Sequence, residues 1–575
     1  MVFIAVITNN ALAENHALLV GIANYHIKPL AGPKNDVLLL QSILRDKWSF
    51  KKQNITLILD KAGTKKNILN NIKSLYQRSK PGDTVFIYLS GHGTSAKDSA
   101  FKSTLPTTSG AFIPIDIESV RNRDKLIDSL IIGRKDLKPL LQLFDNNGRH
   151  VFVAIDACFS GNTVRGLYSE HKLNSRYLAV DEILAGSRSY RSSNNSPQTK
   201  ALKSDAKIKS EAYPYNNIYY LAASGEYEPA QDIKPDMLER YPTIDGKPHG
   251  AFTDTLLRIL NDDFDADTNR DGVISYSELK KALRYFMRIR GFDHTPQGLP
   301  SLAEDRTGLA ARAIFGQNQK RVFKNTKKQN INLPGIKQVN SSLPLNSARA
   351  LFSKNTLLPI MVDKALPKVL ALVKNIKQLK LVDHNGQLRI RKKGNTILFI
   401  SHAGDLIMSL PNPSTKKIIN AIQNQLWIRQ LVDVPIKQDF NIDFDMFASG
   451  RSSTLVAGDT LGLAIKTSET AHLLIVNINA QGQVAVLYPY VESELRPLQA
   501  YKLLVFKELS KVVAPFGREY LQVYAFKESN NNYRELIAKS FTRDSAEAQK
   551  LLYLIKNETI SKARSSLELV TSGLN

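Results

Sequence analysis

The stretch TVFIYLSGHG, residues 84–93, decides the fold class of this chain. Its first six residues are uncharged and rich in β-branched and aromatic side chains, and a glycine-flanked polar motif follows. A short continuous apolar run that ends in glycine is typical of a strand buried on both faces of a parallel sheet. Four further runs have the same character, and they lie at 17–22, 55–59, 151–155 and 218–222.

Amphipathic segments alternate with these runs. Residues 35–47 and 66–78 carry apolar side chains at helical spacing. Buried strands that alternate with helices indicate a mainly parallel sheet covered by helices on both faces. The sequence therefore predicts an α/β domain over residues 14–315.

Length and composition set the wider limits. At about 150 residues per domain, 575 residues predict about four domains, or three with linkers. The single cysteine, Cys158, excludes an intramolecular disulfide and any metal site built from several cysteines. The longest apolar runs fall short of the roughly 18 residues that a membrane span needs.

The first residues predict a signal peptide. Residues 1–13 contain a short apolar stretch and end in Ala11-Leu12-Ala13, a pattern that signal peptidase accepts. The usual basic start is missing because the first Lys or Arg is Lys28, so we interpret the segment as a signal peptide whose beginning was lost through a wrong start codon. This places the protein in the periplasm or outside the cell. The alternative is an ordinary first strand of a cytoplasmic protein.

The chain is strongly basic, with 78 Lys and Arg against 53 Asp and Glu, a net charge of +25. Such a charge favours contact with an anionic surface such as lipid, cell-wall polymer or nucleic acid. The charge is spread widely and no nucleic-acid module is visible, so the partner stays open.

The second half predicts smaller accessory domains. We expect a hairpin around Asn385-Gly386, the strongest short hairpin signal, and then a helix over 416–431. Three apolar runs near the end, with Gly482 at a turn, predict a β-rich region. The predicted units are a basic linker at 316–344, a small α+β accessory domain at 345–440, a β-rich accessory domain at 441–542 and a C-terminal helix at 543–575.

Two strand ends carry reactive side chains. Ser-Gly-His-Gly, residues 90–93, follows one strand, and Asp-Ala-Cys-Phe-Ser-Gly, residues 156–161, follows another. In open α/β sheets, ligands bind at the carboxyl ends of the strands. An imidazole that deprotonates a thiol makes it a potent nucleophile, so His92 and Cys158 are a candidate dyad. Taken singly, each has a structural alternative as a buried side chain.

These motifs resemble the caspase-like cysteine peptidases, and within them the bacterial metacaspase-like branch. The resemblance also rests on residues 17–22 and on Asn35-Asp36. It implies a caspase-like α/β/α sandwich in which Cys158 is the nucleophile and His92 the general acid and base. It further implies that the backbone N–H groups of Gly93 and Cys158 form the oxyanion hole.

The resemblance also implies a preference for basic substrates. Caspases carry Gln where this chain has Asp156, and metacaspase-like enzymes place an Asp two residues before the cysteine to cleave after Arg or Lys. Asp36 looks like a second carboxylate of that pocket. A carboxylate selects a cationic side chain through charge-assisted hydrogen bonds. The structural alternatives are a turn cap for Asp156 and a helix N-cap for Asp36.

A second motif predicts an EF-hand-like calcium loop. Residues 267–278 read DTNRDGVISYSE, with Gly272 at the sixth position and amphipathic flanks. Oxygen ligands at this spacing bind Ca²⁺, and the alternative is a metal-free Asp-rich turn. The pattern assigns side-chain oxygens to Asp267, Asn269, Asp271 and Glu278, a carbonyl to Val273, and a direct or water-mediated contact to Ser275.

A polar insertion, residues 166–215, separates the cysteine motif from the next strand. We expect it on the surface, because long polar insertions usually lie there. Relatives in this family are often cut in this region to mature. Its basic residues would suit a pocket that prefers cations, so self-cleavage is predicted, against a passive surface loop. These residues are Arg176, Arg188, Arg191, Lys200 and Lys203.

The sequence thus predicts a calcium-binding cysteine endopeptidase that cleaves protein or peptide substrates after Arg or Lys. The alternative is an inactive caspase-like scaffold that acts through its accessory domains.

Overall fold

The computed structural model describes most of the chain. The predicted signal peptide and basic linker lie outside the described residues, except for Ala13. The described ranges are 13–95, 110–119, 123–158, 173–178, 213–224, 229–269, 271–292, 294–315, 357–383, 386–401, 406–433, 436, 438–448 and 454–572.

A six-stranded sheet organises the first domain, in the order β11-β9-β7-β3-β1-β2. All neighbours in it pair in parallel except β11, which pairs antiparallel with β9 at one edge. The five apolar runs are therefore strands of one sheet, as the sequence predicts. Their bounds are β1 (Asn15–Gly21), β2 (Ile55–Leu59), β3 (Thr84–Ser90), β7 (His150–Asp156) and β9 (Ile218–Ala222), and the edge strand is β11 (Gln297–Leu299).

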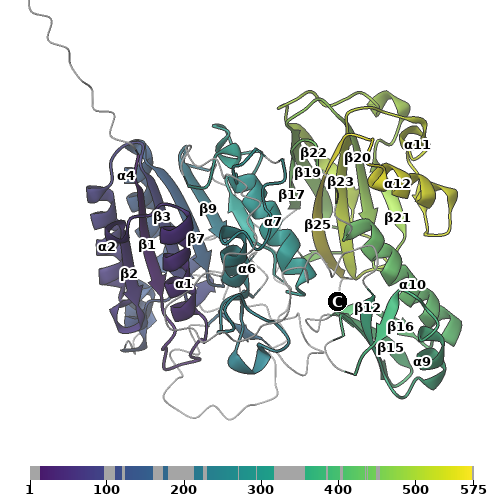
Figure 1. Ribbon diagram of the computed structural model, residues 1–575, viewed down its shortest axis with the longest axis horizontal. Helices are drawn as coiled ribbons and strands as arrows, with labels where there is room; N and C mark the ends of the chain where they lie inside the picture. Colours follow the sequence, from purple (N-terminus) through teal and green to yellow (C-terminus); the bar gives the residue numbers. More distant parts are fainter. Residues whose placement is uncertain are drawn as a thin grey trace, which may run out of the picture.

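Helices cover both faces of this sheet (Figure 1). In β1, Ala17 and Leu19 join one buried apolar cluster, and Leu18 and Val20 join the other. This alternation leaves no polar face, so the strand is buried on both sides. The α/β/α sandwich is therefore confirmed. The helices α1 (Pro33–Lys47), α6 (Ala251–Leu260) and α7 (Tyr276–Ile289) pack on one face, and α2 (Lys65–Arg78) and α4 (Lys138–Asn146) pack on the other.

The register of the sheet aligns three strand ends. Gly21 at the end of β1 lies beside Ser90 at the end of β3, and Ser90 lies beside Asp156 at the end of β7. The segments that follow β3 and β7 therefore leave the sheet at the same edge. Two small sheets extend this end. One consists of β4 (Gly93–Ser95), β5 (Gly110–Phe112) and β6 (Ile131–Ile132), and the other of β8 (Asn174–Ser175) and β10 (Gln231–Asp232). Helix α3 (Arg123–Ser129) lies between β5 and β6 in the chain.

The second unit is a five-stranded sheet, and it corrects the predicted hairpin. β13 (Leu379–Leu381) and β14 (Leu388–Lys393) do not pair with each other, because β12 (Leu358–Val362) lies between them and pairs in parallel with both. Burial of β12 between two partners outweighs the local turn signal. The remaining elements are β15 (Thr396–Ser401), β16 (Leu406–Pro411), α9 (Pro367–Val373) and α10 (Thr415–Val432).

The last unit packs two sheets over an apolar core, and it corrects the predicted C-terminal helix. The helix α12 (Ala546–Lys556) is shorter than expected, and β25 (Lys562–Ser572) follows it. β25 pairs with β23 over nine residue pairs, and its Ala563, Leu567 and Leu569 alternate into the core. The other elements are β17 (Ile442–Ala448), β18 (Thr454–Val456), β19 (Thr460–Thr467), β20 (His472–Ile478), β21 (Val484–Tyr488), β22 (Leu504–Lys511), β23 (Arg518–Phe526), β24 (Ser540–Phe541) and α11 (Asn531–Arg534).

The helix α10 joins the second and third units. Its Ile418 and Ile422 lie in the core of the five-stranded sheet, whereas Trp427 and Leu431 lie in the core of the last unit. The two accessory domains predicted from the sequence therefore share one helix. Within the described part of the chain, no helix is long and apolar enough to cross a membrane.

Salt bridges attach the last unit to the peptidase-like domain through α7 and β17. Lys280 pairs with Asp445 at 3.0 Å, and Lys281 pairs with Asp443 at 3.0 Å. Further along the helix, Arg288 pairs with Asp433. Lys281 and Arg288 lie on the same side of α7 because they are seven residues, about two helical turns, apart, and Lys280 is the direct neighbour of Lys281. The apolar residues of β17 point instead into the core of their own unit.

Asp445→Ala should weaken this attachment strongly. The substitution leaves Lys280 nearly buried without its carboxylate, and it removes the acceptor for the backbone N–H of Leu302. Breaking a buried pair from one side costs about 3 kcal/mol, so the melting temperature should fall by several degrees. Asp544→Ala is the control, because that side chain is 78% exposed and its pair with Arg543 should contribute little. Equal melting of both variants and the wild type would contradict this account of the interface.

Candidate active site

Cys158 lies two residues beyond β7 and is completely buried. Its Sγ lies 3.2 Å from the carbonyl oxygen of Ala230 and 3.7 Å from the hydroxyl of Ser175. Burial raises the pKa of the thiol to about 12, because a thiolate would lose its hydration there. In this state the side chain is a neutral thiol.

His92 lies two residues beyond β3, and its imidazole is also buried. Nε2 is 2.7 Å from the carbonyl oxygen of Lys28, and a carbonyl can only accept. Nε2 therefore carries the proton, and Nδ1 keeps its lone pair. Burial lowers the pKa of His92 to about 4, so the ring is neutral at neutral pH.

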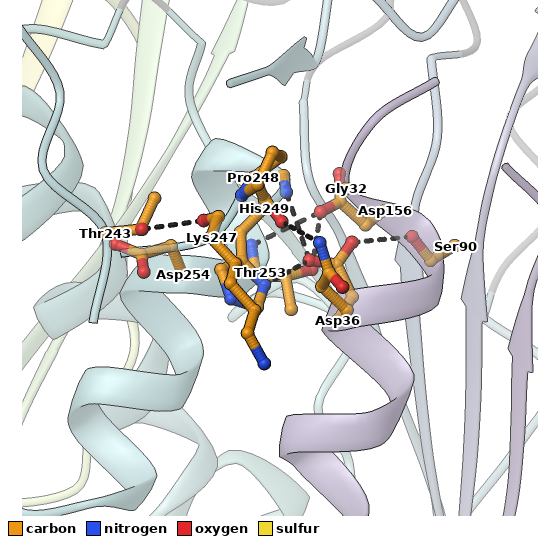
Figure 2. A network of polar contacts seen from close by, with 12 residues as sticks. Gly32, Asp36, Ser90, Asp156, Thr243, Lys247, Pro248, His249, Thr253 and Asp254 are labelled. Carbon is orange, nitrogen blue, oxygen red and sulfur yellow. Dashed lines mark hydrogen bonds and ion pairs between the residues drawn. The ribbon is translucent and has the colours of Figure 1, made fainter. Parts of the chain in front are cut away.

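Buried acidic side chains gather at the same end of the sheet, and Figure 2 shows two of them, Asp36 and Asp156, in their network of polar contacts. We call this cluster the acidic pocket. Asp36, in the first turn of α1, accepts hydrogen bonds from Ser90 at 2.8 Å and from the backbone N–H of Gly250. Asp156, the last residue of β7, accepts from the main chain and hydroxyl of Thr253. Both side chains reach across to other elements. The N-cap alternative for Asp36 is therefore wrong, because Gly32 holds the N-cap position of α1. Asp156 accepts a backbone N–H of the first turn of α6.

Sequence reasoning missed two members of this pocket. Asp232, in β10, accepts hydrogen bonds from the backbone N–H groups of Ala31 and Gly32. His249 lies between Asp36 and Asp245, 2.9 Å from an oxygen of each. Neither stands in a motif, and both lie far along the chain from Asp36, so no local signal pointed to them.

The side chain of Arg176 fills the pocket. Its guanidinium pairs with three carboxylates, those of Asp36 at 2.9 Å, Asp156 at 3.0 Å and Asp232 at 2.8 Å. It also donates to the hydroxyl of Ser90 at 2.7 Å. Arg176 is 0% exposed although it belongs to the predicted surface insertion. The expectation of a surface position is therefore wrong for Arg176, because three buried carboxylates need a cation, and for Leu178, which is also buried. Residues 173–175 and Tyr177 are partly exposed, and residues 166–172 and 179–212 lie outside the described residues.

The main chain of Arg176 is held as firmly as its side chain. Its carbonyl oxygen accepts from the backbone N–H of Gly93 at 2.9 Å and of Cys158 at 3.4 Å. Its own N–H donates to the carbonyl of Ala230 at 3.0 Å. The two residues before it, β8, pair antiparallel with β10. The segment therefore crosses the site as an extended peptide with one carbonyl polarised by two donors.

The pKa values of the pocket's side chains depend on burial and on the neighbouring charges. Burial raises the pKa of Asp156 to about 6 against the opposing effect of Arg176. Burial also acts on Asp36, but Arg176 and His249 outweigh it and hold the pKa of Asp36 below its usual value. The hydrogen bonds of His249 to Asp245 and Asp36 overcome burial and raise its pKa to about 10, so it is charged. Asp36 therefore faces both the imidazolium and the guanidinium, whereas Asp156 and Asp232 face the guanidinium.

The predicted calcium loop has the sharp turn of such a loop, but its carboxylates accept hydrogen bonds from groups of the loop itself. Gly272 has φ +86°, which favours glycine, and its N–H donates to Asp267 at 2.9 Å. The Glu278 carboxylate accepts from Ser275 and from the N–H of Asn269. Across the described residues, no group of three or more His, Cys, Asp or Glu side chains is gathered to hold a metal ion. Position four, residue 270, lies outside the described residues.

A parallel sheet between helical layers, with a cysteine and a histidine beyond neighbouring strand ends, defines the caspase-like class of domain. Residues 15–165 match the family model described as metacaspase, peptidase C14 domain. The first domain is therefore similar to the metacaspase family over these residues.

Curated relatives agree with this assignment. Metacaspase-1 of Plasmodium falciparum is 30% identical over 178 residues, which cover 29% of this chain and 27% of that protein. Metacaspase III c of Phaeodactylum tricornutum is 30% identical over 183 residues, 30% of this chain and 50% of that protein. Metacaspase-7 of Arabidopsis thaliana is 26% identical over 155 residues, 26% of this chain and 35% of that protein. The matches span half or less of each of these relatives.

The rate at which a thiol reagent labels Cys158 should report how strongly Arg176 keeps the site closed. Cys158 is the only cysteine of the chain, and it should react slowly with iodoacetamide because it is buried and protonated. Arg176→Ala should speed labelling at least about tenfold, which corresponds to about 1.4 kcal/mol on the opening equilibrium. Arg149→Ala, a buried arginine bonded to Ser79 away from the site, controls for general destabilisation. Equal acceleration by both variants would mean that Arg176 does not close the site specifically.

Proposed function

We propose that the protein is a cysteine endopeptidase of the metacaspase type that cleaves proteins or peptides after Arg or Lys. The observation that carries the proposal is the placement of Arg176. Its side chain lies among three carboxylates while its carbonyl oxygen faces the N–H groups of Gly93 and Cys158. This is the arrangement that a peptidase needs at the bond it cleaves.

The proposed mechanism gives each group a role, and Nδ1 of His92 can act as the base because it has no hydrogen-bond partner among the described residues. Nδ1 of His92 takes the proton of the Cys158 thiol, and the thiolate attacks the substrate carbonyl carbon. The two N–H groups stabilise the oxyanion, and the imidazolium then protonates the leaving amine. Water hydrolyses the thioester and releases the second product. The carbonyl of Lys28 holds the imidazole in the required tautomer, which is the role of a carboxylate in many catalytic triads.

The proposed specificity can be tested with matched peptides that differ only in the residue before the cleaved bond. Arg peptides should be cleaved best and Lys peptides less well, because a single ammonium cannot use the fork of contacts that the guanidinium makes. Asp peptides should not be cleaved. Asp156→Ala should lower kcat/KM on Arg peptides by about 100-fold, the effect of losing about 2.7 kcal/mol from a buried charge pair.

Cys158→Ala is the control for contaminating peptidases. Cleavage after Asp, or unchanged kinetics in Asp156→Ala, would reject the pocket assignment. No cleavage of any peptide by the wild type, either before or after the insertion is cut, would favour the scaffold alternative.

The placement of Arg176 also supports self-cleavage and indicates which peptide bond would be cut. Of the basic residues in the insertion, Arg176 lies in the acidic pocket with its carbonyl against both N–H donors. We therefore propose that the chain cuts itself between Arg176 and Tyr177. The uncut segment blocks the pocket, so this cut also precedes cleavage of other substrates.

Incubation of the purified chain should produce fragments 1–176 and 177–575 with a new amino terminus at Tyr177. Cys158→Ala should stay intact, and Arg176→Glu should not be cut at this bond because a carboxylate would enter a pocket of carboxylates. Amino-terminal sequencing of the fragments identifies the bond. Equal cutting of Cys158→Ala, or a wild type that stays intact, would contradict self-cleavage.

We further propose that the loop at residues 267–278 binds Ca²⁺. The specific support is the sharp turn at Gly272 between α6 and α7, together with a donor set made only of oxygen, which suits a hard cation. Asp267, Asn269, Asp271, Val273, Ser275 and Glu278 would hold the ion. The ion would neutralise carboxylates that otherwise repel one another and would stabilise the start of α7.

Calcium should therefore raise the melting temperature, by about 5 °C at 100 times the dissociation constant. Glu278→Gln should remove most of that increase because it takes away the last carboxylate of the loop. Glu508→Gln, an exposed glutamate on β22, should keep it. Calorimetry that detects no calcium binding to the wild type would reject the site.

A further inference from the structure

The chain continues through the site beyond Arg176, and the next two residues are also held. Tyr177 forms a parallel bridge with Gly93, and the N–H of Leu178 donates to the carbonyl of Gly93 at 3.1 Å. Gly93 begins β4, which pairs on its other side with Phe112 of β5. The segment after Arg176 thus adds to the edge of β4 as an extra strand.

Gly93 sets the register between the two sides of the bond. Its N–H binds the carbonyl oxygen of Arg176, and its own carbonyl binds the N–H of Leu178. A side chain at position 93 could not fit, because its Cβ would lie 2.2 Å from the carbonyl oxygen of Cys158. Gly93 therefore fixes the position of Leu178 relative to the carbonyl of Arg176, because it is hydrogen-bonded to both residues.

The two side chains after the bond have different surroundings. Tyr177 is partly exposed, whereas Leu178 is 0% exposed. Leu178 belongs to the same buried apolar cluster as Ala157 and Phe112, which lie directly beside Gly93. The residue two places after the bond is thus an aliphatic side chain that is fully buried in an apolar cluster.

We propose that the cleft has a subsite for a large aliphatic side chain two residues beyond the cleaved bond, so that its substrates read Arg-Xaa-Leu or similar. The inference rests on the proposed peptidase function. Arg176 is bound through its side chain, N–H and carbonyl as a substrate residue before the cleaved bond would be. The surroundings of Leu178 are therefore those that the second substrate residue after the bond would occupy. The main-chain contacts to Gly93 accept any sequence, and the burial of the side chain supplies the selectivity.

The test uses internally quenched peptides built on the sequence of residues 173–178, and the wild-type protein is assayed after incubation for self-cleavage, which opens the pocket. Replacing the leucine by glycine should lower kcat/KM about tenfold, because the apolar area is no longer buried. Replacing it by methionine should change kcat/KM less than threefold, because methionine adapts to apolar space. Replacing it by aspartate should lower kcat/KM further than glycine does, because the carboxylate would be buried without a partner.

The peptide with alanine in place of the tyrosine is the matched control, and its kcat/KM should stay within about threefold because that side chain is partly exposed. Equal rates for the leucine, glycine and aspartate peptides would overturn the subsite and leave the peptidase assignment standing. Cleavage of none of these peptides, nor of an Arg peptide that ends at a fluorogenic leaving group, would reject both.

Self-cleavage gives a second measurement within the chain. Leu178→Met should be cut between residues 176 and 177 about as fast as the wild type, and Leu178→Asp at least tenfold more slowly. Circular dichroism of both variants shows whether they fold. A folded Leu178→Asp chain that is cut at the wild-type rate would overturn the subsite.

Discussion

The ion cluster around Arg176 is the interaction on which the site depends. Three fully buried carboxylates cannot stay ionised together without a cation, because desolvation and mutual repulsion both oppose it. His249 supplies one positive charge and Arg176 the second. A pocket with this charge deficit needs a buried cationic side chain to balance it. The chain's own arginine supplies it in this structure.

The position of that cluster follows from the sheet. Parallel pairing brings the ends of β1, β3 and β7 to one edge, so Ser90 and Asp156 lie side by side and the following residues reach His92 and Cys158. The bound segment then completes two small sheets, one with β10 before Arg176 and one with β4 after it. Backbone pairing before and after Arg176 fixes the position of the peptide bond that follows it, and such pairing does not depend on the side chains. Selectivity is left to the side chains that become buried.

Helix α7 links the remaining parts of the molecule. Its first turn ends the predicted calcium loop at Glu278, and its next turn carries the salt bridges to Asp443 and Asp445. Figure 1 shows α7 beside β17, the strand that holds both aspartates. The segment after it places His294 against the carbonyl of Ala223, just beyond the strand β9. The same helix therefore contacts the loop, the accessory unit and the sheet that builds the site.

The sequence by itself determined the features that are written locally. Continuous apolar runs identified the five parallel strands, and glycine-flanked motifs at two of their ends identified His92 and Cys158, because strand period and turn chemistry are properties of neighbouring residues. Tertiary structure decided everything that depends on distant pairing. It placed β12 between two strands that a turn signal would have joined, and it turned the expected last helix into β25, because burial between partner strands outweighs local preference. It also brought Asp232 and Arg176 to the pocket, since no pattern along the chain encodes which charge a buried carboxylate will meet.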